Sequence, residues 1–469
     1  MTTYKPNKSN NIFSFIKLAL SSEQQDFTTG SIRRAVFLLA IPMILEMSLE
    51  SVFAVVDIFF VSKLGSYATS TIGLTESFIT IVYSIAIGLS MAATAMVARR
   101  VGEKNHEEAS RSGAQAIMLA VSVTLIISIL GMIFSSDILR MMGGNEEIIQ
   151  RGSGYTRIMM GSSLVIMLLF MINGVFRGAG NAAIAMKSLW LANICNIILC
   201  PTLINGWGPF PALGLEGAAI ATATGRTIGV LYQLYHLLND KGIIRMKRNH
   251  FLPDKNILRS LINVASTATL QFLIASASWM VLIKIISRFG EDVIAGYTIA
   301  IRLIVFFILP AWGLSNAAAT LVGQNLGAKQ PERAETSVWK VAKYNAIFMA
   351  TVSLIFLAGA EFFVGLISSE ATVVAVAVKA LRIVSLGYIF YGIGMVMMNA
   401  FNGAGDSRTP TWINLFGFWL FQIPLAYCLA VLLDLGPTGV FIAIITAETA
   451  ISIAGVILFR RGRWKKVTI

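Results

Sequence analysis

The sequence GLSMAA at residues 88–93 recurs 225 residues later as GLSNAA at residues 313–318. The same displacement, without a gap, aligns glycines and charged residues from Arg34 to Gly180 with the second part of the chain. Chance matching of Gly and Ala in apolar sequence does not explain a register that includes charged positions, so we interpret it as an internal duplication. The aligned pairs include Gly65 with Gly290, Gly102 with Gly327, Lys104 with Lys329, Glu107 with Glu332, Arg157 with Arg382, and the run 178–180 with 403–405.

Composition places both copies in a lipid bilayer. The chain has 469 residues, of which 56% are hydrophobic and 13% charged, with a mean hydropathy of +0.74, whereas soluble domains carry about 25% charged residues. Its apolar runs reach the length of about 20 residues that a helix needs to cross the hydrocarbon layer. We predict an all-α polytopic membrane protein with twelve transmembrane helices in two pseudosymmetric six-helix bundles. The predicted spans are 35–61, 68–98, 110–136, 152–177, 182–205, 213–239, 257–288, 293–323, 335–360, 373–402, 409–433 and 438–460.

Lysine and arginine residues set the predicted orientation, because cytoplasmic loops retain them. They gather in the N-terminal segment, in the loops near 99–111, 241–259 and 329–343, and in the tail at 460–466. Both termini are therefore predicted to be cytoplasmic. The net charge of +13 is spread over short loops instead of one patch, so we expect no nucleic-acid partner. The alternate loops hold few basic residues, namely Lys63, Arg140, Arg151 and Arg288.

The duplication also predicts the domain organisation. Six spans per copy is an even number, so both copies enter the membrane in the same orientation and are related by an axis along the membrane normal. This arrangement predicts two side-by-side lobes with a cleft between them. Residues 11–20 form either a short interfacial helix or a frayed tail. The predicted units are a cytoplasmic tail at 1–30, an N-lobe at 31–240, a cytoplasmic linker at 241–256, and a C-lobe at 257–469 with a basic cytoplasmic tail.

Catalytic and metal-binding patterns are missing from the sequence. Three cysteines and three histidines lie scattered without the spacing of metal ligands. No Gly-x-Ser-x-Gly elbow, His-Glu-x-x-His motif or Walker loop is present. We therefore predict that the protein is not an enzyme and uses no cofactor, and we assign no catalytic, cofactor-binding or metal-ligating residue.

The first span carries three carboxylates. Glu46, Glu50 and Asp57 are spaced by four and seven residues, so at 100° per residue they fall within about 40° of one another on one helix face. A charge near the bilayer centre costs at least about 2.5–3.5 kcal/mol, and ionisable groups within spans are functional candidates for that reason. Like charges crowded in a dry environment favour a bound proton, so this stripe is a candidate for proton coupling. The alternative is that some of these acids face a water-filled cleft or bond to neighbouring helices.

The stripe belongs to the first copy alone. Under the repeat, Glu46, Glu50 and Asp57 correspond to Gln271, Ala275 and Leu282. The fold therefore does not require the acids, and coupling through the second lobe is not expected.

Several short segments occur in a particular order. The first span contains IP at 41–42, VDIFFV at 56–61 and LG at 64–65, followed by ARRVG at 98–102, NGVFRGAG at 173–180 and GLEGAA at 214–219. In this order, with the repeat and these loop lengths, the chain resembles the multidrug and toxic compound extrusion (MATE) transporters from about residue 30 to residue 460. The resemblance implies a V-shaped pair of bundles in a bacterial cytoplasmic membrane that exports organic cations in exchange for H⁺ or Na⁺. It also implies that the protein functions as a monomer, with small-molecule organic cations and membrane lipids as its partners.

The resemblance also assigns the ion site. Asp57 matches the aspartate that the family uses for ion coupling in the N-lobe, and Asn196 matches an asparagine on the fifth span. Cys200 stands where the family often has an aspartate, and this departure puts a family-type sodium site in doubt. Thr222 on the sixth span is expected to contribute an oxygen, and Glu50 is a candidate for the missing negative charge.

Two ionisable groups are predicted to face the cleft from opposite lobes. Glu76 and Arg302 lie one residue apart in repeat register, so a salt bridge between them would close one state of the transporter. The alternative is that each such group pairs within its own lobe, Lys284, Arg226 and Glu448 included. Cationic Lys284 and Arg302 leave anionic or zwitterionic cargo open, and Gln271 is a further cleft candidate.

Two broader alternatives remain at this stage. A lipid-linked oligosaccharide flippase of the same superfamily is the alternative function, favoured by the cationic groups in the cleft. The methionines on the spans at 152–177 and 373–402 are interpreted as lipid-facing filler, although flexible thioethers also suit variable apolar ligands. They are Met159, Met160, Met167, Met171, Met395, Met397 and Met398.

Overall fold

The computed structural model describes residues 12–21, 26–239 and 242–469, and these residues form helices joined by loops, with no strand among them. The short helix expected near the N-terminus is present as α1 (Ile12–Leu20). Its first predicted residue, Asn11, lies outside the described residues, as do much of the predicted tail and the first residue of the predicted linker.

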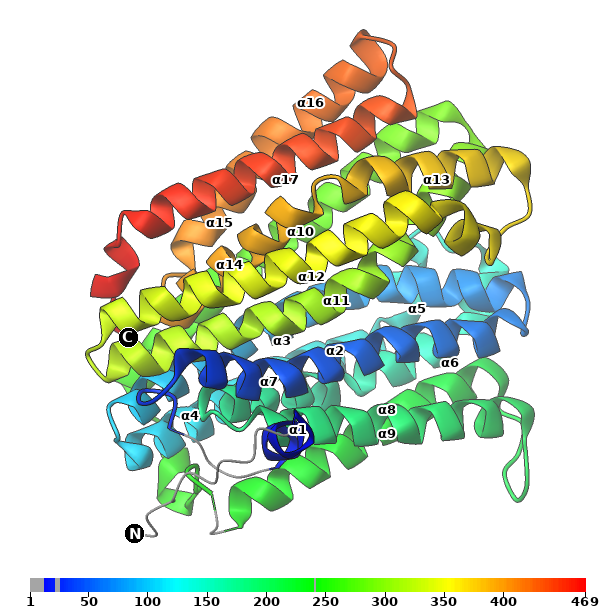
Figure 1. The fold of residues 1–469 in the computed structure, drawn as a ribbon. Helices are drawn as coiled ribbons and strands as arrows, with labels where there is room; N and C mark the ends of the chain where they lie inside the picture. Colours follow the sequence, from blue (N-terminus) through cyan, green and yellow to red (C-terminus); the bar gives the residue numbers. More distant parts are fainter. Residues whose placement is uncertain (1–11, 22–25, 240–241) are drawn as a thin grey trace.

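The predicted spans of the first copy are all found as helices (Figure 1). The span predicted at 152–177 consists of two consecutive helices, α6 and α7, and a short helix, α5, precedes them. The helices are α2 (Ile32–Ser62), α3 (Ser66–Gly102), α4 (His106–Ile133), α5 (Ser135–Met141), α6 (Glu146–Gly161), α7 (Ser163–Gly178), α8 (Ala182–Asn205) and α9 (Gly214–Leu238).

The second copy contains two departures from regular helix. α13 and α14 form one predicted span that is bent by 58° at its break, and the span predicted at 409–433 alternates between α-helix and π-helix. Its helices are α10 (Lys255–Ile286), α11 (Glu291–Gly327), α12 (Pro331–Gly365), α13 (Ala371–Ser385), α14 (Tyr388–Ala404), α15 (Arg408–Asn414), η3 (Leu415–Gln422), α16 (Ile423–Tyr427), η4 (Cys428–Leu432) and α17 (Pro437–Arg460). Short 3₁₀ turns lie at η1 (Arg248–Phe251), η2 (Ser287–Phe289) and η5 (Arg463–Lys466).

Local sequence explains where these helices begin and end. The Asn181 side chain accepts a hydrogen bond from the Ile184 amide at 3.3 Å and so caps the first turn of α8. Gly206, with φ of 73°, ends the same helix in the left-handed conformation that glycine adopts readily. These two caps place α8 at the residues predicted from hydropathy.

The number of spans agrees with an all-α membrane fold. Among the described residues, ten helical segments are long and apolar enough to cross a membrane, or eleven if the bent pair α13–α14 counts as one span. The remaining predicted span is α9, which has 25 residues but is more polar because it carries residues such as Arg226 and Gln233. Both of these polar side chains are buried inside the protein, so the length of α9 and its packing support a twelfth span.

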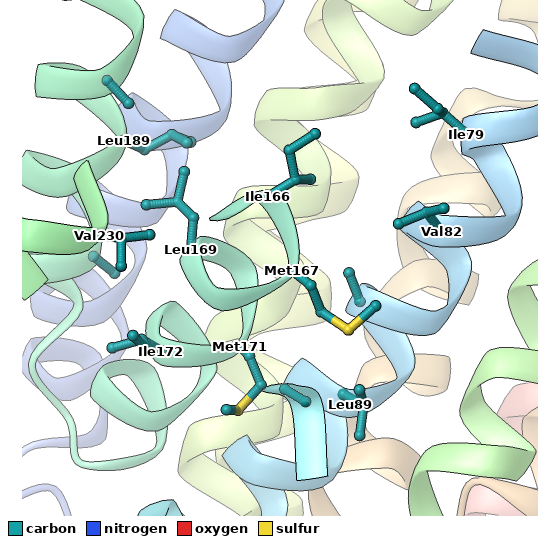
Figure 2. Packing of buried hydrophobic residues seen from close by; sticks show 14 of the residues in the cluster. Ile79, Val82, Leu89, Ile166, Met167, Leu169, Met171, Ile172, Leu189 and Val230 are labelled. Carbon is teal, nitrogen blue, oxygen red and sulfur yellow. The ribbon is translucent and has the colours of Figure 1, made fainter. Parts of the chain in front are cut away.

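Each copy has a packed interior. Figure 2 shows part of the first, where Met167 and Met171 of α7 point among apolar residues of neighbouring helices. Both methionines are 0% exposed, so interpreting them as lipid-facing filler was wrong. The sequence pattern misled because methionine has similar hydropathy on a lipid-facing surface and in a core.

The two copies meet through α2 and α3 on one side and α10 and α11 on the other (Figure 1). They meet most closely at the end that carries the loops 103–105 and 328–330, which we call the basic end. A Cβ on Gly102 would overlap the carbonyl group of Gln324, and a Cβ on Gly327 would overlap that of Arg99. Glycines therefore allow the backbones of α3 and α11 to touch at the basic end.

The helices separate toward the opposite end. Ser51 of α2 donates a hydrogen bond to the Phe306 carbonyl of α11 at 3.1 Å, but every residue of α2 from Val52 to Phe60 is at least partly exposed. By contrast, α11 is almost continuously buried from Gly313 to Gly327. This conformation is therefore closed at the basic end and open at the other.

Candidate functional site

The three carboxylates of α2 point toward the helices of their own copy, as their spacing on one face predicts. Each one has a different partner. Glu46 contacts α7, Glu50 contacts α8 and α9, and Asp57 contacts α8. The partners decide which acid is free to exchange an ion.

Glu46 is held in a buried polar network. Its side chain is 0% exposed and forms an ion pair with Arg177. Asn173 donates a hydrogen bond to the same carboxylate at 3.0 Å, and the Asn173 carbonyl oxygen accepts from Ser188 at 3.0 Å and from Gln233 at 2.6 Å. A carboxylate neutralised by an adjacent guanidinium needs no proton, so Glu46 serves to tie α2 to α7.

Glu50 is paired in the same way, with a cation from α9. Arg226 donates to its Oε1 atom at 2.7 Å, and Asn193 of α8 donates to its Oε2 atom at 2.8 Å. The Arg226 guanidinium also lies 5.2 Å from the centre of the Phe53 ring, within the range of a cation–π contact. The structure therefore gives Glu50 a counter-ion and does not direct it toward Cys200.

Asp57 lies apart from both ion pairs. Its Oδ1 atom accepts a hydrogen bond from the Cys200 thiol at 3.5 Å, and it has no ion-pair partner among the described residues. The residue is partly exposed. Of the three acids, Asp57 is the one that combines access to solvent with an uncompensated charge.

The other residues predicted for the ion site lie close by on α8 and α9. Asn196 donates a hydrogen bond to Thr222 at 2.8 Å, so these two polar groups are bonded to each other. Asn196 lies one helical turn from Cys200, which is the residue that reaches Asp57. No group of three or more His, Cys, Asp or Glu side chains among the described residues has the arrangement of a metal site.

The predicted salt bridge across the cleft is not formed in this conformation. Glu76 of α3 and Arg302 of α11 are both exposed and make no ion pair with each other. Both lie in the halves of their helices that face the open end, where α3 and α11 have separated. Lys284 of α10 is likewise exposed, and it forms no ion pair within the described chain. The bridge stays a prediction for a state that is closed at this end.

A cavity of about 410 Å³ lies between the two copies. Gln271, predicted as a cleft residue, lines it from α10, and Ile87 and Met91 line it from α3 of the first copy. Met395 and Met398 of α14 also line it, so these two methionines face a cavity instead of lipid. Its remaining wall residues come from the second copy and include aromatic and amide side chains.

Sequence analysis missed one functional candidate in this cavity. Glu448 of α17 lines the wall and is 9% exposed, but it was expected to pair within its own lobe. The structure gives it no hydrogen-bond or ion-pair partner among the described residues. The available signal was the repeat itself, whose register shifts before the last helix of each copy.

Comparisons with known proteins agree with the repeat and the fold. A family model described as MatE matches residues 42–202 and again residues 268–428. The probable multidrug resistance protein YoeA of Bacillus subtilis is 24% identical over 443 residues, covering 94% of this chain and 96% of that protein. The FAD transporter of Shewanella oneidensis is 26% identical over 412 residues, covering 86% of this chain and 89% of that protein.

A solved structure shares the whole architecture. The outward-facing conformation of a multidrug resistance MATE family transporter of the MOP superfamily superposes with a TM-score of 0.87 at 24% identity. The match covers 94% of this chain and 98% of that one. The likeness confirms the predicted fold class.

Proposed function

The chain belongs to the MatE family, and on that premise we propose that it is a secondary active antiporter that exports amphipathic organic cations in exchange for H⁺ or Na⁺. The relative from Bacillus subtilis, a probable multidrug resistance protein, supports export of drug-like compounds. The cavity between the copies supports it too, because ligand sites are concave, mostly apolar and typically about 300–1,000 Å³ in volume.

Asp57 is the observation that carries the coupling mechanism. It is the acid of the α2 stripe that has no ion-pair partner in the described chain, and it is partly exposed. When the cleft opens to the more acidic side, Asp57 takes up a proton, and when the lobes rock it releases that proton to the other side. Cargo and proton need not meet, since each can bias the same two-state equilibrium.

Protons are the first candidate for the coupling ion. A sodium site requires several oxygen ligands, but the nearest partner of Asp57 is the sulfur of Cys200. The oxygen of Thr222 is already bonded to Asn196. A single carboxyl group is sufficient to carry a proton, whereas these neighbours do not form an oxygen cage.

The conformation supports alternating access. Positive loop charge predicts that the basic end is cytoplasmic, so the closed basic end corresponds to an outward-open state. Rocking of the two lobes about the central cavity would open the basic end and close the other. We propose a monomer in the cytoplasmic membrane with both termini in the cytoplasm.

The test is ethidium efflux from proteoliposomes with an imposed proton or sodium gradient. We expect a proton gradient to drive efflux, and we expect Asp57→Asn to abolish it in correctly inserted protein. The matched control is Asp137→Asn, which removes an exposed acid of the same copy that pairs with Arg140 at the surface. Efflux driven by sodium alone would assign the other ion. Undiminished efflux by Asp57→Asn would refute coupling through this residue.

A second candidate is export of an anionic compound. The FAD transporter relative and the exposed cations Lys284 and Arg302 favour it. Efflux of a flavin nucleotide from the same vesicles, lost on changing Lys284 or Arg302 to Gln, would support this alternative. If neither gradient moves any cation or nucleotide, flipping of a lipid-linked oligosaccharide becomes the function to test.

A further inference from the structure

Glu448 is a buried carboxylate without a counter-ion. It lies in the interior of α17, is 9% exposed, and lines the cavity between the copies. Among the described residues it has no hydrogen-bond or ion-pair partner. Buried charges in proteins are normally paired, so an unpaired one that faces a cavity indicates that its partner enters from the cavity.

The first copy shows what the second copy lacks at this position. Near the last helix of each copy, a displacement of 222 residues aligns Gly217 with Gly439 and Arg226 with Glu448. The two glycines pack alike, each against the backbone of the preceding helix. The last helices of the two copies therefore correspond, and Glu448 occupies the place of Arg226.

The counter-ion has been lost while an ionisable group has been kept. In the first copy Arg226 pairs with Glu50, and the repeat counterpart of Glu50 is Ala275. Both Ala275 and Glu448 line the cavity. The small alanine leaves open space where the first copy places a charged side chain, so the acid faces a vacant volume of the right location for a cation.

A second set of polar atoms in the cavity is also unsatisfied. Gln271 Oε1, Asn399 Oδ1 and both side-chain polar atoms of Asn402 are buried without a partner in the described chain. All three residues line the cavity. Under the repeat, Gln271 and Asn402 correspond to Glu46 and Arg177, which form a buried ion pair in the first copy. Buried polar groups without partners are rare in proteins, so these oxygens are acceptors available to a ligand.

Aromatic side chains complete the wall. Phe272, Trp279, Trp312 and Phe418 line the same cavity, and aromatic ring faces attract organic cations. The wall thus combines one carboxylate, three amide oxygens and several aromatic rings. This combination suits a flat or bulky cation that also carries N–H donors.

We propose that this cavity is the cargo site and that Glu448 receives the positive charge of an amphipathic organic cation. The oxygens of Gln271, Asn399 and Asn402 accept hydrogen bonds from the N–H groups of the cargo. The proposal rests on the cation export proposed above, and it separates the roles of the two copies. The first copy carries the coupling ion at Asp57, and the second copy recognises the cargo.

The test is equilibrium binding of ethidium to the full-length purified protein in lipid nanodiscs, without any gradient. We expect Glu448→Gln to raise the Kd by about 30-fold or more, as expected when one partner of a desolvated charge pair is removed. Glu448→Asp keeps the charge on a shorter side chain and should give an intermediate Kd. The matched control is Glu361→Gln, which removes an acid of the same copy whose side chain is 73% exposed.

The outcomes separate this proposal from the coupling mechanism. Asp57→Asn should bind ethidium with the wild-type Kd although it fails in transport. Glu448-dependent binding without gradient-driven efflux would refute the antiport and leave the cargo site standing. The cargo site is overturned if Glu448→Gln binds ethidium as tightly as the wild type. It is also overturned if that variant binds normally but loses proton-driven efflux, because Glu448 would then carry a proton, or if the wild type binds no organic cation.

Discussion

The Glu50–Arg226 ion pair provides a quantitative test of the first copy's electrostatics. The Arg226 side chain is 2% exposed and the Glu50 side chain 17% exposed. Arg226→Met would leave the Glu50 carboxylate with the 2.8 Å hydrogen bond from Asn193 as its remaining strong contact. It would also remove the guanidinium that lies over the Phe53 ring.

The expected magnitude follows from burial. Breaking a buried pair by removing one partner costs about 3–5 kcal/mol, whereas replacing both partners with apolar residues is often nearly neutral. We therefore expect Arg226→Met and Glu50→Leu each to lower the free energy of unfolding by about 3–5 kcal/mol. The double variant should lose less than either single variant, because no uncompensated charge remains.

The assay is reversible unfolding in mixed micelles, read as a double-mutant cycle. The matched control is the pair formed by Glu361 and Arg382, whose side chains are 73% and 42% exposed. Removing either partner there should change the free energy of unfolding by less than about 1 kcal/mol. The reasoning fails if Arg226→Met costs no more than the control, or if the losses of the two single variants simply add.

Three further predictions follow from the cleft and the basic end. Exchanging the charges of Glu76 and Arg302 should restore the ethidium efflux that either single reversal lowers, because the bridge would re-form in the state closed at the open end; a double variant no better than the singles would contradict this. Cys200→Asp should let a sodium gradient drive efflux, since it adds a carboxylate beside Asp57, and unchanged sodium independence would show that these neighbours do not form a site. Gly102→Leu should increase amide hydrogen exchange at the basic end, because the added side chain overlaps the α11 backbone; unchanged protection there would show that the close approach is not needed for closure.

Helix positions could be predicted from the sequence because they depend on local properties. A span must be apolar over the thickness of the bilayer, so hydropathy alone located the span at 182–205 and caps fixed its ends. The bend between Ser385 and Tyr388 and the π-helical turns after Asn414 were not predicted. They depend on how neighbouring helices pack, and the sequence of one span does not record that.

Partners of charged residues were predicted less well. Spacing placed Glu46, Glu50 and Asp57 on one face, and the structure confirms that they face their own copy. Sequence could not show that two of them meet arginines, because those arginines come from helices far along the chain. The like charges are therefore separated by cations, and one acid remains for coupling.

By itself, the sequence determined the duplication, the bilayer as solvent and the positions of the helices, because glycine motifs and apolar lengths are local signals. Only the tertiary structure decided which ionisable groups are paired. Glu448 illustrates the limit: the loop before α17 is shorter than the loop before α9, so the register of 225 residues no longer holds there. Its lack of a counter-ion depends on every side chain that surrounds it, and the folded chain alone brings those side chains together.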